Sequence, residues 1–184
     1  MSTGSKIRQL IQEAARLAEL TALNEYVADF SERVFEDGKA ADGTMIGVYS
    51  ERPWNAKDEL SGYSGLLPIS KLKGQTFFKG GYKELRGKLG REKEFVNLDL
   101  TGSLRLSVKV GQISGNAAVG IVGNEDAKKA KDNEKHFKKV IFGASQPEIG
   151  NITKTFLTDF KRQLVRANID RVAANNKKDV RIKI

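Results

Sequence analysis

The chain has 184 residues, which is the length of one ordinary domain and is enough to bury a core without disulfides or metals. It has no cysteine, which excludes disulfides and thiolate metal sites, and its formal net charge is +9. The N-terminus lacks the apolar stretch of a signal peptide, and no apolar run reaches the length of a membrane span. We therefore expect no contact with a membrane.

The positive charge is concentrated in the second half of the chain. Residues 1–90 hold 13 Lys and Arg against 12 Asp and Glu, whereas residues 91–184 hold 19 against 11. A basic half indicates an acidic partner such as nucleic acid or an acidic protein, although a solvated basic surface explains the excess equally well.

The first segment, residues 1–38, is predicted to be one long helix. Apolar residues recur at steps of three and four from Ile7 to Val34, Ser5 is a candidate N-cap, and Gly38 is a candidate stop. Residues 44–51 alternate as a short strand does.

Residues 51–75 have no sustained period and contain Trp54, the only tryptophan. A long irregular segment in a compact domain is usually functional, so we expect an extended arm that anchors Trp54 on a neighbouring subunit. The alternative is that the segment folds back over the core.

Between residues 77 and 102 aromatic residues alternate with Lys and Arg, as they do in single-stranded nucleic-acid platforms. The same mixture suits a contact between subunits. Gly80 and Gly81 are expected to form a hinge before a short helix over residues 81–89, and Phe77 and Phe78 would otherwise be core residues.

Strict alternation in SLRLSVKV predicts a half-buried strand, and residues 103–122 are expected to form a hairpin. Asn124 is a candidate cap for a helix to Phe137, with acidic residues in its first turn and basic residues in its last. A capping box at Ser145 begins a long amphipathic helix to about Ala174. The basic tail, residues 176–184, carries Val180, Ile182 and Ile184 as a frayed end or an edge strand.

These elements predict an α+β fold, with an antiparallel sheet and hairpin flanked by long N-terminal and C-terminal helices. Three parts are expected: the helix 1–38, an α+β core 39–175 with the arm at 51–75, and the tail 176–184.

The sequence lacks the common catalytic and cofactor motifs. The only histidine, His136, lies among lysines, no phosphate-binding glycine motif occurs, and neighbouring acidic residues point apart. We therefore expect no enzyme activity, no catalytic residues, no cofactor and no metal.

The order of GGYKELRGKLGR, FVNLDLTGSL, AVGIVGNEDAKKAKDNEK and VIFGASQPEI resembles the tail-completion, or head–tail joining, proteins of tailed phages, which are related to virion-morphogenesis proteins. The resemblance covers about residues 44–172. The positions that carry it are Gly80, Gly81, Tyr82, Arg86, Leu98, Leu100, Thr101, Gly102, Val119, Gly120, Asn124, Ala127, Ala130, Asn133, Glu134, Ile141, Phe142 and Gly143. This sequence departs from the family at one place: the segment after Thr101-Gly102 is often helical in the family, whereas SLRLSVKV here alternates as a strand does.

The resemblance implies a structural component of the virion, made in the host cytoplasm. Copies would form a sixfold or twelvefold ring in the neck, joining the portal-side connector to the tail around the DNA channel, in contact with other neck and tail proteins and close to the genome. Closed rings need heterologous contacts. The predicted subunit-contact residues are Trp54, Phe77, Phe78, Gly80, Gly81, Tyr82, Arg86, Thr101, Gly102, Val180, Ile182 and Ile184. The alternative is a basic nucleic-acid-binding module.

Overall fold

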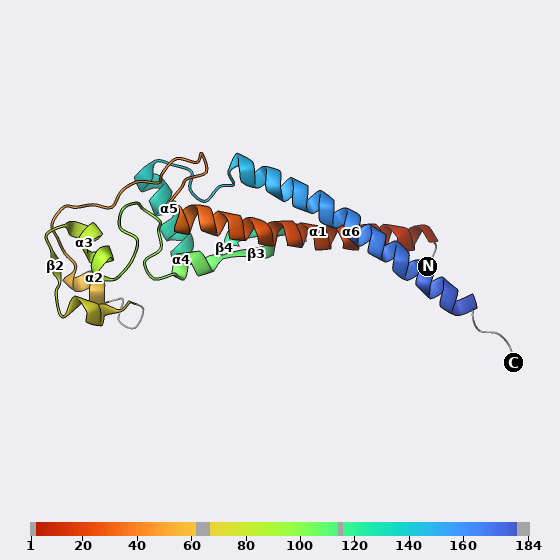
Figure 1. Cartoon of the computed structure of the whole chain (residues 1–184), viewed down its shortest axis with the longest axis horizontal. Helices are drawn as coiled ribbons and strands as arrows, with labels where there is room; N and C mark the ends of the chain where they lie inside the picture. Colours follow the sequence, from red (N-terminus) through yellow and green to blue (C-terminus); the bar gives the residue numbers. More distant parts are fainter. Residues whose placement is uncertain (1–2, 62–66, 114–115, 180–184) are drawn as a thin grey trace. The chain divides into compact units, whose positions relative to one another are not determined.

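A computed structural model describes residues 3–61, 67–113 and 116–179 and shows the predicted mixture of helix and antiparallel sheet (Figure 1). In chain order the elements are α1 (Thr3–Ser31), the π-helical turn η1 (Glu32–Glu36), β1 (Trp54–Asn55), α2 (Lys57–Ser61), the 3₁₀ turn η2 (Ile69–Leu72), β2 (Phe77–Phe78), α3 (Gly81–Lys88), α4 (Ser103–Ser107), β3 (Val108–Ile113), β4 (Asn116–Ile121), α5 (Asn124–Phe137) and α6 (Gln146–Asp179). β1 pairs with β2, and β3 pairs with β4.

The chain folds into two compact units. One contains residues 1–27, 110–119 and 147–184, and the other contains residues 28–109 and 120–146. Each is described by itself below.

The first unit is built on contacts between α1 and α6. Ala14, Ala18 and Ala22 are buried at four-residue steps on α1, where small side chains allow close approach of another element. Asp159 of α6 is only 4 % exposed, and its carboxylate accepts hydrogen bonds from Thr21 at 3.1 Å and from Arg162 at 2.8 Å. The contact therefore includes a buried polar pair, which favours one register of the two helices.

The second unit contains a core that gathers apolar side chains from several loops and helix ends. Phe30, Val34 and Ile141 are almost fully buried there. The guanidinium of Arg33 donates to the carbonyl oxygens of Lys39, Ile141 and Gly143, at 3.0, 3.3 and 2.8 Å. One side chain thus ties residues 39–40 to 141–143.

A smaller cluster in the same unit joins β1, β2, α2 and α3. Its buried members are Ala56, Leu60, Leu67, Leu72, Phe78, Leu85 and Leu89, with Trp54, Ile69, Tyr82 and Leu100 packed against them. The described parts of this segment, residues 51–61 and 67–75, therefore contain β1, α2 and η2 and fold back onto a core, whereas the sequence favoured an extended arm. The apolar residues spaced through this segment supply that core.

The positions of the predicted helices are confirmed, whereas two predicted caps are wrong: Ser5 lies inside α1, and the N-cap of α5 is Gly123 rather than Asn124. The long N-terminal helix ends before Gly38, whose φ of +65° suits glycine. α3 and α5 lie where they were expected, and α6 begins at Gln146, directly after Ser145 of the predicted capping box. α6 extends to Asp179, into the segment predicted as a tail.

The strand predictions were less accurate. Residues 103–107 are helical, because Gly102 takes the left-handed conformation at φ +83° and its carbonyl accepts the Leu106 N–H at 3.0 Å. Leu104 is buried and Leu106 is 72 % exposed, which is the opposite of the alternation expected for a strand. At 44–51 the only β contact among the described residues is the bridge from Met45 to Lys39.

Candidate functional site

The GGYKELR segment enters α3 through a hinge that only glycine fits. Gly81 has φ +63°, and a Cβ built on it would lie 2.4 Å from the carbonyl oxygen of Arg52. At the start of the helix, the Gly80 N–H donates to the Glu84 carboxylate at 2.9 Å. This bond, and secondarily the ammonium group of Lys88, hold the pKa of Glu84 below its ordinary value.

Two of the predicted contact residues pack against each other. The Tyr82 ring lies 5.7 Å from Trp54 and 5.4 Å from Tyr49, measured between centroids. Trp54 is half-buried by this packing. Its ring therefore anchors residues 51–55 to α3 of the same chain.

Arg86 is the best-defined charged group of the motif, and it is 1 % exposed. Its Nε donates to the carbonyl oxygen of Glu92 at 2.5 Å, and its Nη2 donates to Asn97 Oδ1 at 2.8 Å and to the Asp99 carbonyl oxygen at 3.0 Å. Its Cζ lies 4.3 Å from the centre of the Tyr49 ring, a cation–π distance. Arg86 thus holds residues 92–99 against α3.

Asn97 extends this network to η1. Its Nδ2 donates to the carbonyl oxygen of Phe35 at 2.9 Å, and its Oδ1 also accepts the Tyr49 hydroxyl at 3.1 Å. Burial raises the pKa of the Tyr49 phenol, and the nearby charge of Arg86 acts in the opposite direction. We refer to Tyr49, Arg86, Asn97 and Asp99 as the Arg86 cluster.

A cavity of about 520 Å³ adjoins the Arg86 cluster in the same unit. Thr101 and Gly102, both predicted contact residues, form part of its wall together with Tyr82 and Arg86. The structure therefore brings together four of the predicted residues, from two separate motifs, at one cavity.

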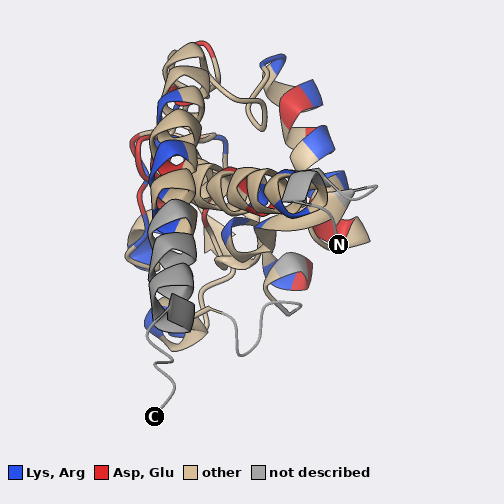
Figure 2. Ribbon diagram, turned by 90° about the vertical axis from the view of Figure 1, so that its right-hand side faces the viewer, with Lys and Arg blue, Asp and Glu red and all other residues tan. Residues whose placement is uncertain are grey.

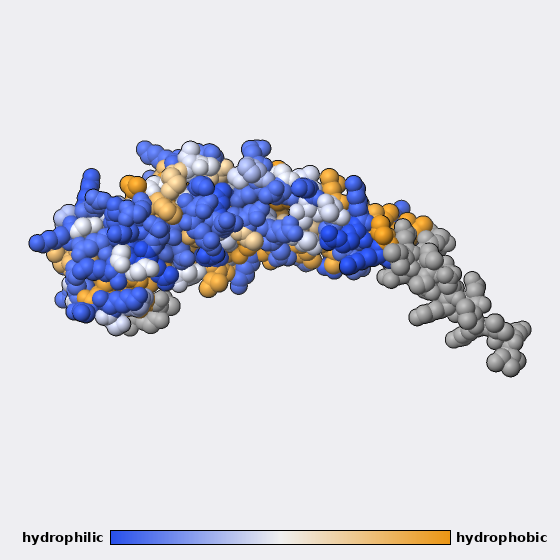
Figure 3. All heavy atoms as spheres, viewed as in Figure 1, coloured by the Kyte–Doolittle hydropathy of each residue, from blue (hydrophilic) through white to orange (hydrophobic). Residues whose placement is uncertain are grey.

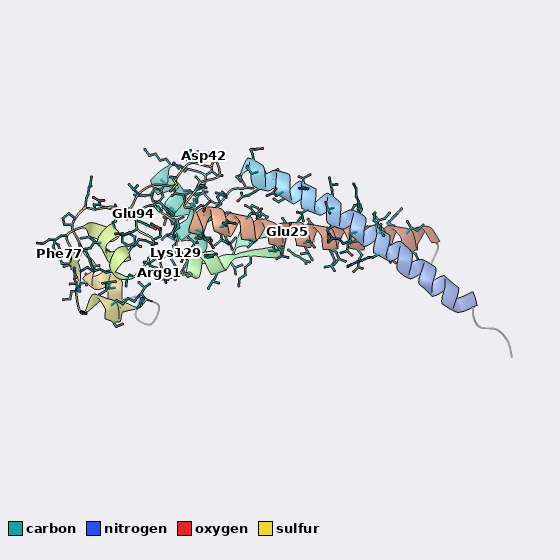
Figure 4. The ribbon with its side chains drawn as sticks, in the orientation of Figure 1. Glu25, Asp42, Phe77, Arg91, Glu94 and Lys129 are labelled. Carbon is teal, nitrogen blue, oxygen red and sulfur yellow. The ribbon has the colours of Figure 1, made fainter. Side chains whose placement is uncertain are left out.

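Phe77 and Phe78 lie on opposite faces of β2. Phe78 is fully buried, whereas Phe77 is 50 % exposed and is labelled at the outer edge of its unit in Figure 4. Lys71, Lys73 and Lys79, in the same region of the chain, are exposed. Val180, Ile182 and Ile184 lie outside the described residues.

Sequence reasoning missed Tyr49 and Asn97, which complete the Arg86 cluster. No local sequence signal distinguishes an asparagine that bridges two distant segments. Nor does the sequence single out Arg33, which is buried and donates to three carbonyl groups, although arginine is usually exposed.

Within the described part of the chain, no group of three or more His, Asp and Glu side chains is arranged to hold a metal ion. Among the same residues, no helix has both the length and the apolar character needed to cross a membrane. Comparison with known proteins gave no match: no family model, no curated protein and no solved structure is significantly similar to the chain.

Proposed function

We propose that the chain is a structural virion protein that assembles head to tail into a ring in a phage neck, between the portal-side connector and the tail. The sequence resemblance suggests this role. The structural observation that supports it best is a β-hairpin whose outer edges have no partner strand among the described residues.

The hairpin offers two different edges. The Val122 N–H donates to the Ser107 carbonyl at 2.7 Å. A regular antiparallel ladder that continued from this pair would set Val110 opposite Val119 and Gln112 opposite Ala117. In that register these residues belong to the non-hydrogen-bonded pairs, so their own N–H and C=O groups point outwards. A two-stranded sheet is marginally stable alone, and exposed edges pair readily with strands of another chain.

Pairing of the β3 edge of one copy with the β4 edge of the next is a heterologous contact. Such contacts generate a closed ring when the rotation between copies divides a full turn. The backbone hydrogen bonds supply affinity in this mode, and the side chains of alternate residues supply specificity. The function is then geometric, and no reaction is required.

A second assembly surface lies on the N-terminal turns of α1. Ile7, Leu10 and Ile11 are 42, 39 and 46 % exposed, although they continue the stripe that is buried from Ala14 onwards. Figure 3 shows apolar residues at the surface in this part of α1. An exposed apolar stripe of this kind favours burial against another chain.

The alternative function, a nucleic-acid-binding module, has two observations in its favour. Phe77 is half-exposed in a part of the chain that also carries the exposed Lys71, Lys73 and Lys79. Basic residues also lie along α6, in blue in Figure 2. Against it, Phe78 is buried and Tyr82 is packed between two rings, so the rings of this stretch do not form a stacking platform. The ring function accounts for the hairpin edges, which are unpaired in the described part of the chain, and for the exposed apolar stripe of α1, both of which the nucleic-acid function leaves unexplained.

The test blocks the two hairpin edges separately. Gln112→Pro removes an outward N–H from β3, and Ala117→Pro removes one from β4. Each variant alone should fail to form closed rings, and an equimolar mixture should form one-to-one dimers through the two unblocked edges, measured by light scattering. The far-UV circular dichroism of each variant serves as the control for folding. Closed rings from either variant, or no dimer from the mixture of folded variants, would contradict this mode of assembly.

A further inference from the structure

The cavity beside the Arg86 cluster has the features of a binding site. It measures about 520 Å³, and its walls come from residues 48–50, α3, residues 96–104 and α5. Val96, Leu98, Leu104 and Phe137 supply apolar wall, and Val48 at the same cavity is 76 % exposed. A cavity of this size that combines apolar wall with polar groups fits a ligand or an inserted side chain.

The backbone around the cavity is strained. Leu98 has φ +52°, a conformation that is rare and unfavourable for a bulky residue. Arg86 binds the residues on both sides of it, Asn97 through Oδ1 and Asp99 through the carbonyl oxygen, which holds the strained residue in place. Strain maintained by a buried network is typical of functional sites, and here it presents Leu98 to the cavity.

The charged groups of the wall are cationic. Arg86 and Lys129 line the cavity together with the imidazole of His136, and none of the described lining residues is an Asp or a Glu. The hydroxyl and amide groups of Thr101, Ser103 and Asn133 also line it. Two carboxylates lie close to this wall. Asp126 is 3.0 Å from the Lys129 ammonium and also accepts the Ser103 hydroxyl at 3.4 Å. The Asp99 Oδ1 is buried without a hydrogen-bond partner among the described residues and lies 4.0 Å from the Cβ position of Gly102.

Arg86 brings a buried positive charge that is only partly compensated. In the described part of the chain its hydrogen bonds use Nε and Nη2, its acceptors are uncharged oxygens, and no carboxylate forms an ion pair with it. The pKa of the Glu92 carboxyl is lowered chiefly by the hydrogen bond from the Glu94 N–H, and the charge of Arg86 makes the smallest contribution to that lowering. A buried cation is stabilised by an anion that approaches it.

We propose that this cavity binds an acidic segment of a partner protein, with one Asp or Glu side chain directed towards Arg86 and Lys129 and a neighbouring apolar side chain against Leu98, Leu104 and Phe137. The depth of Arg86 distinguishes this ligand from nucleic acid, because of the two cations only Lys129, whose side chain is 54 % exposed, lies at the surface. Nucleic-acid phosphates need cations at the surface, whereas Arg86 is 1 % exposed and is reached only by a side chain that enters the cavity. This binding site does not depend on ring formation.

The proposal is tested by fluorescence anisotropy on the full chain, which reports binding whether or not the protein assembles. The probe is a fluorescein-labelled peptide, Leu-Asp-Phe-Leu with a blocked C-terminus, and the control probe is Leu-Asn-Phe-Leu, which has the same shape without the charge. The Asp peptide should bind about tenfold or more tightly than the Asn peptide. Equal affinities, or no binding of the Asp peptide at protein concentrations of about 1 mM, would overturn the proposal.

Two variants locate the binding. Lys129→Gln should weaken the Asp peptide several-fold, while Lys128→Gln, the adjacent exposed lysine that does not line the cavity, should leave its affinity unchanged. Ser103→Phe places a ring at an exposed position of the wall and should abolish binding, with the fluorescence of Trp54 confirming that the unit is folded. Unchanged binding in both Lys129→Gln and Ser103→Phe would overturn the site. Complete competition by a short single-stranded oligothymidine would assign the site to nucleic acid and would also overturn it.

Discussion

Replacing Arg86 with Met tests whether the Arg86 cluster holds residues 92–99 in place. The substitution keeps most of the apolar volume and removes three hydrogen bonds from a charged donor. Hydrogen bonds to charged groups contribute about 1.5–3 kcal/mol each, and relief of the burial of an uncompensated charge offsets part of the loss. Asn97 Oδ1 keeps the Tyr49 hydroxyl as a donor, which offsets more. We expect a net loss of about 3 kcal/mol in the free energy of unfolding.

Trp54 is the natural probe for this measurement, because it is the only tryptophan and packs against Tyr82 in the same unit as Arg86. Urea unfolding followed by its fluorescence should show a lower midpoint for Arg86→Met at an unchanged slope. The matched control is Arg16→Met, whose guanidinium is 53 % exposed and 3.9 Å from Glu13, and which should change stability by less than about 0.5 kcal/mol. A loss below about 1 kcal/mol for Arg86→Met would refute the structural role given to the cluster.

Three further substitutions test other parts of the structure. Gly81→Ala should lower the free energy of unfolding, followed by Trp54 fluorescence, by about 2–4 kcal/mol, because the new Cβ would meet the Arg52 carbonyl. The control, Gly87→Ala in the same helix, meets only the flexible Lys93 side chain and should be neutral or stabilising. Equal effects of the two substitutions would contradict the hinge at Gly81. Asp159→Ala should lower the free energy of unfolding, followed by far-UV circular dichroism, by about 2–3 kcal/mol. The control, Asp132→Ala at an exposed position, should change it little. A neutral result for Asp159→Ala would show that the polar contact between α1 and α6 is dispensable. The lowered pKa of Glu84 means that its contribution to stability is complete above the ordinary glutamate pKa and is lost as the pH falls through the lower folded value. Glu84→Gln should therefore flatten the decline in stability below about pH 4.5, and an unchanged decline would exclude this carboxyl as its source.

The helices could be predicted from sequence because their signals are local. The three-and-four spacing from Ile7 onwards, the Asn124 start and the Ser145 capping box each depend on residues within a few positions of one another. The segment SLRLSVKV shows the limit of this approach. Its alternation suits a strand over eight residues, but the left-handed Gly102 begins a helical turn that runs to Ser107 before the strand starts.

The candidate site could be predicted only in part, because it depends on tertiary contacts. GGYKELR and LDLTG identified Tyr82, Arg86, Thr101 and Gly102, which do meet at one cavity. The sequence did not indicate that Arg86 would be buried, since arginine is usually exposed, or that Leu98 would adopt a positive φ. Nor did the sequence indicate that Phe77 would be exposed and Phe78 buried, because the strand they form is two residues long and too short to show an alternating pattern.

The most direct test of the proposed ring is the native mass of the full chain at high concentration, measured by light scattering with the 260 and 280 nm absorbance of the same peak. Our account predicts a discrete species of six or twelve 20.3 kDa subunits without nucleic acid, whose class averages show a closed ring. A monomer at every concentration, or a monomer that carries nucleic acid removable by salt, would contradict it.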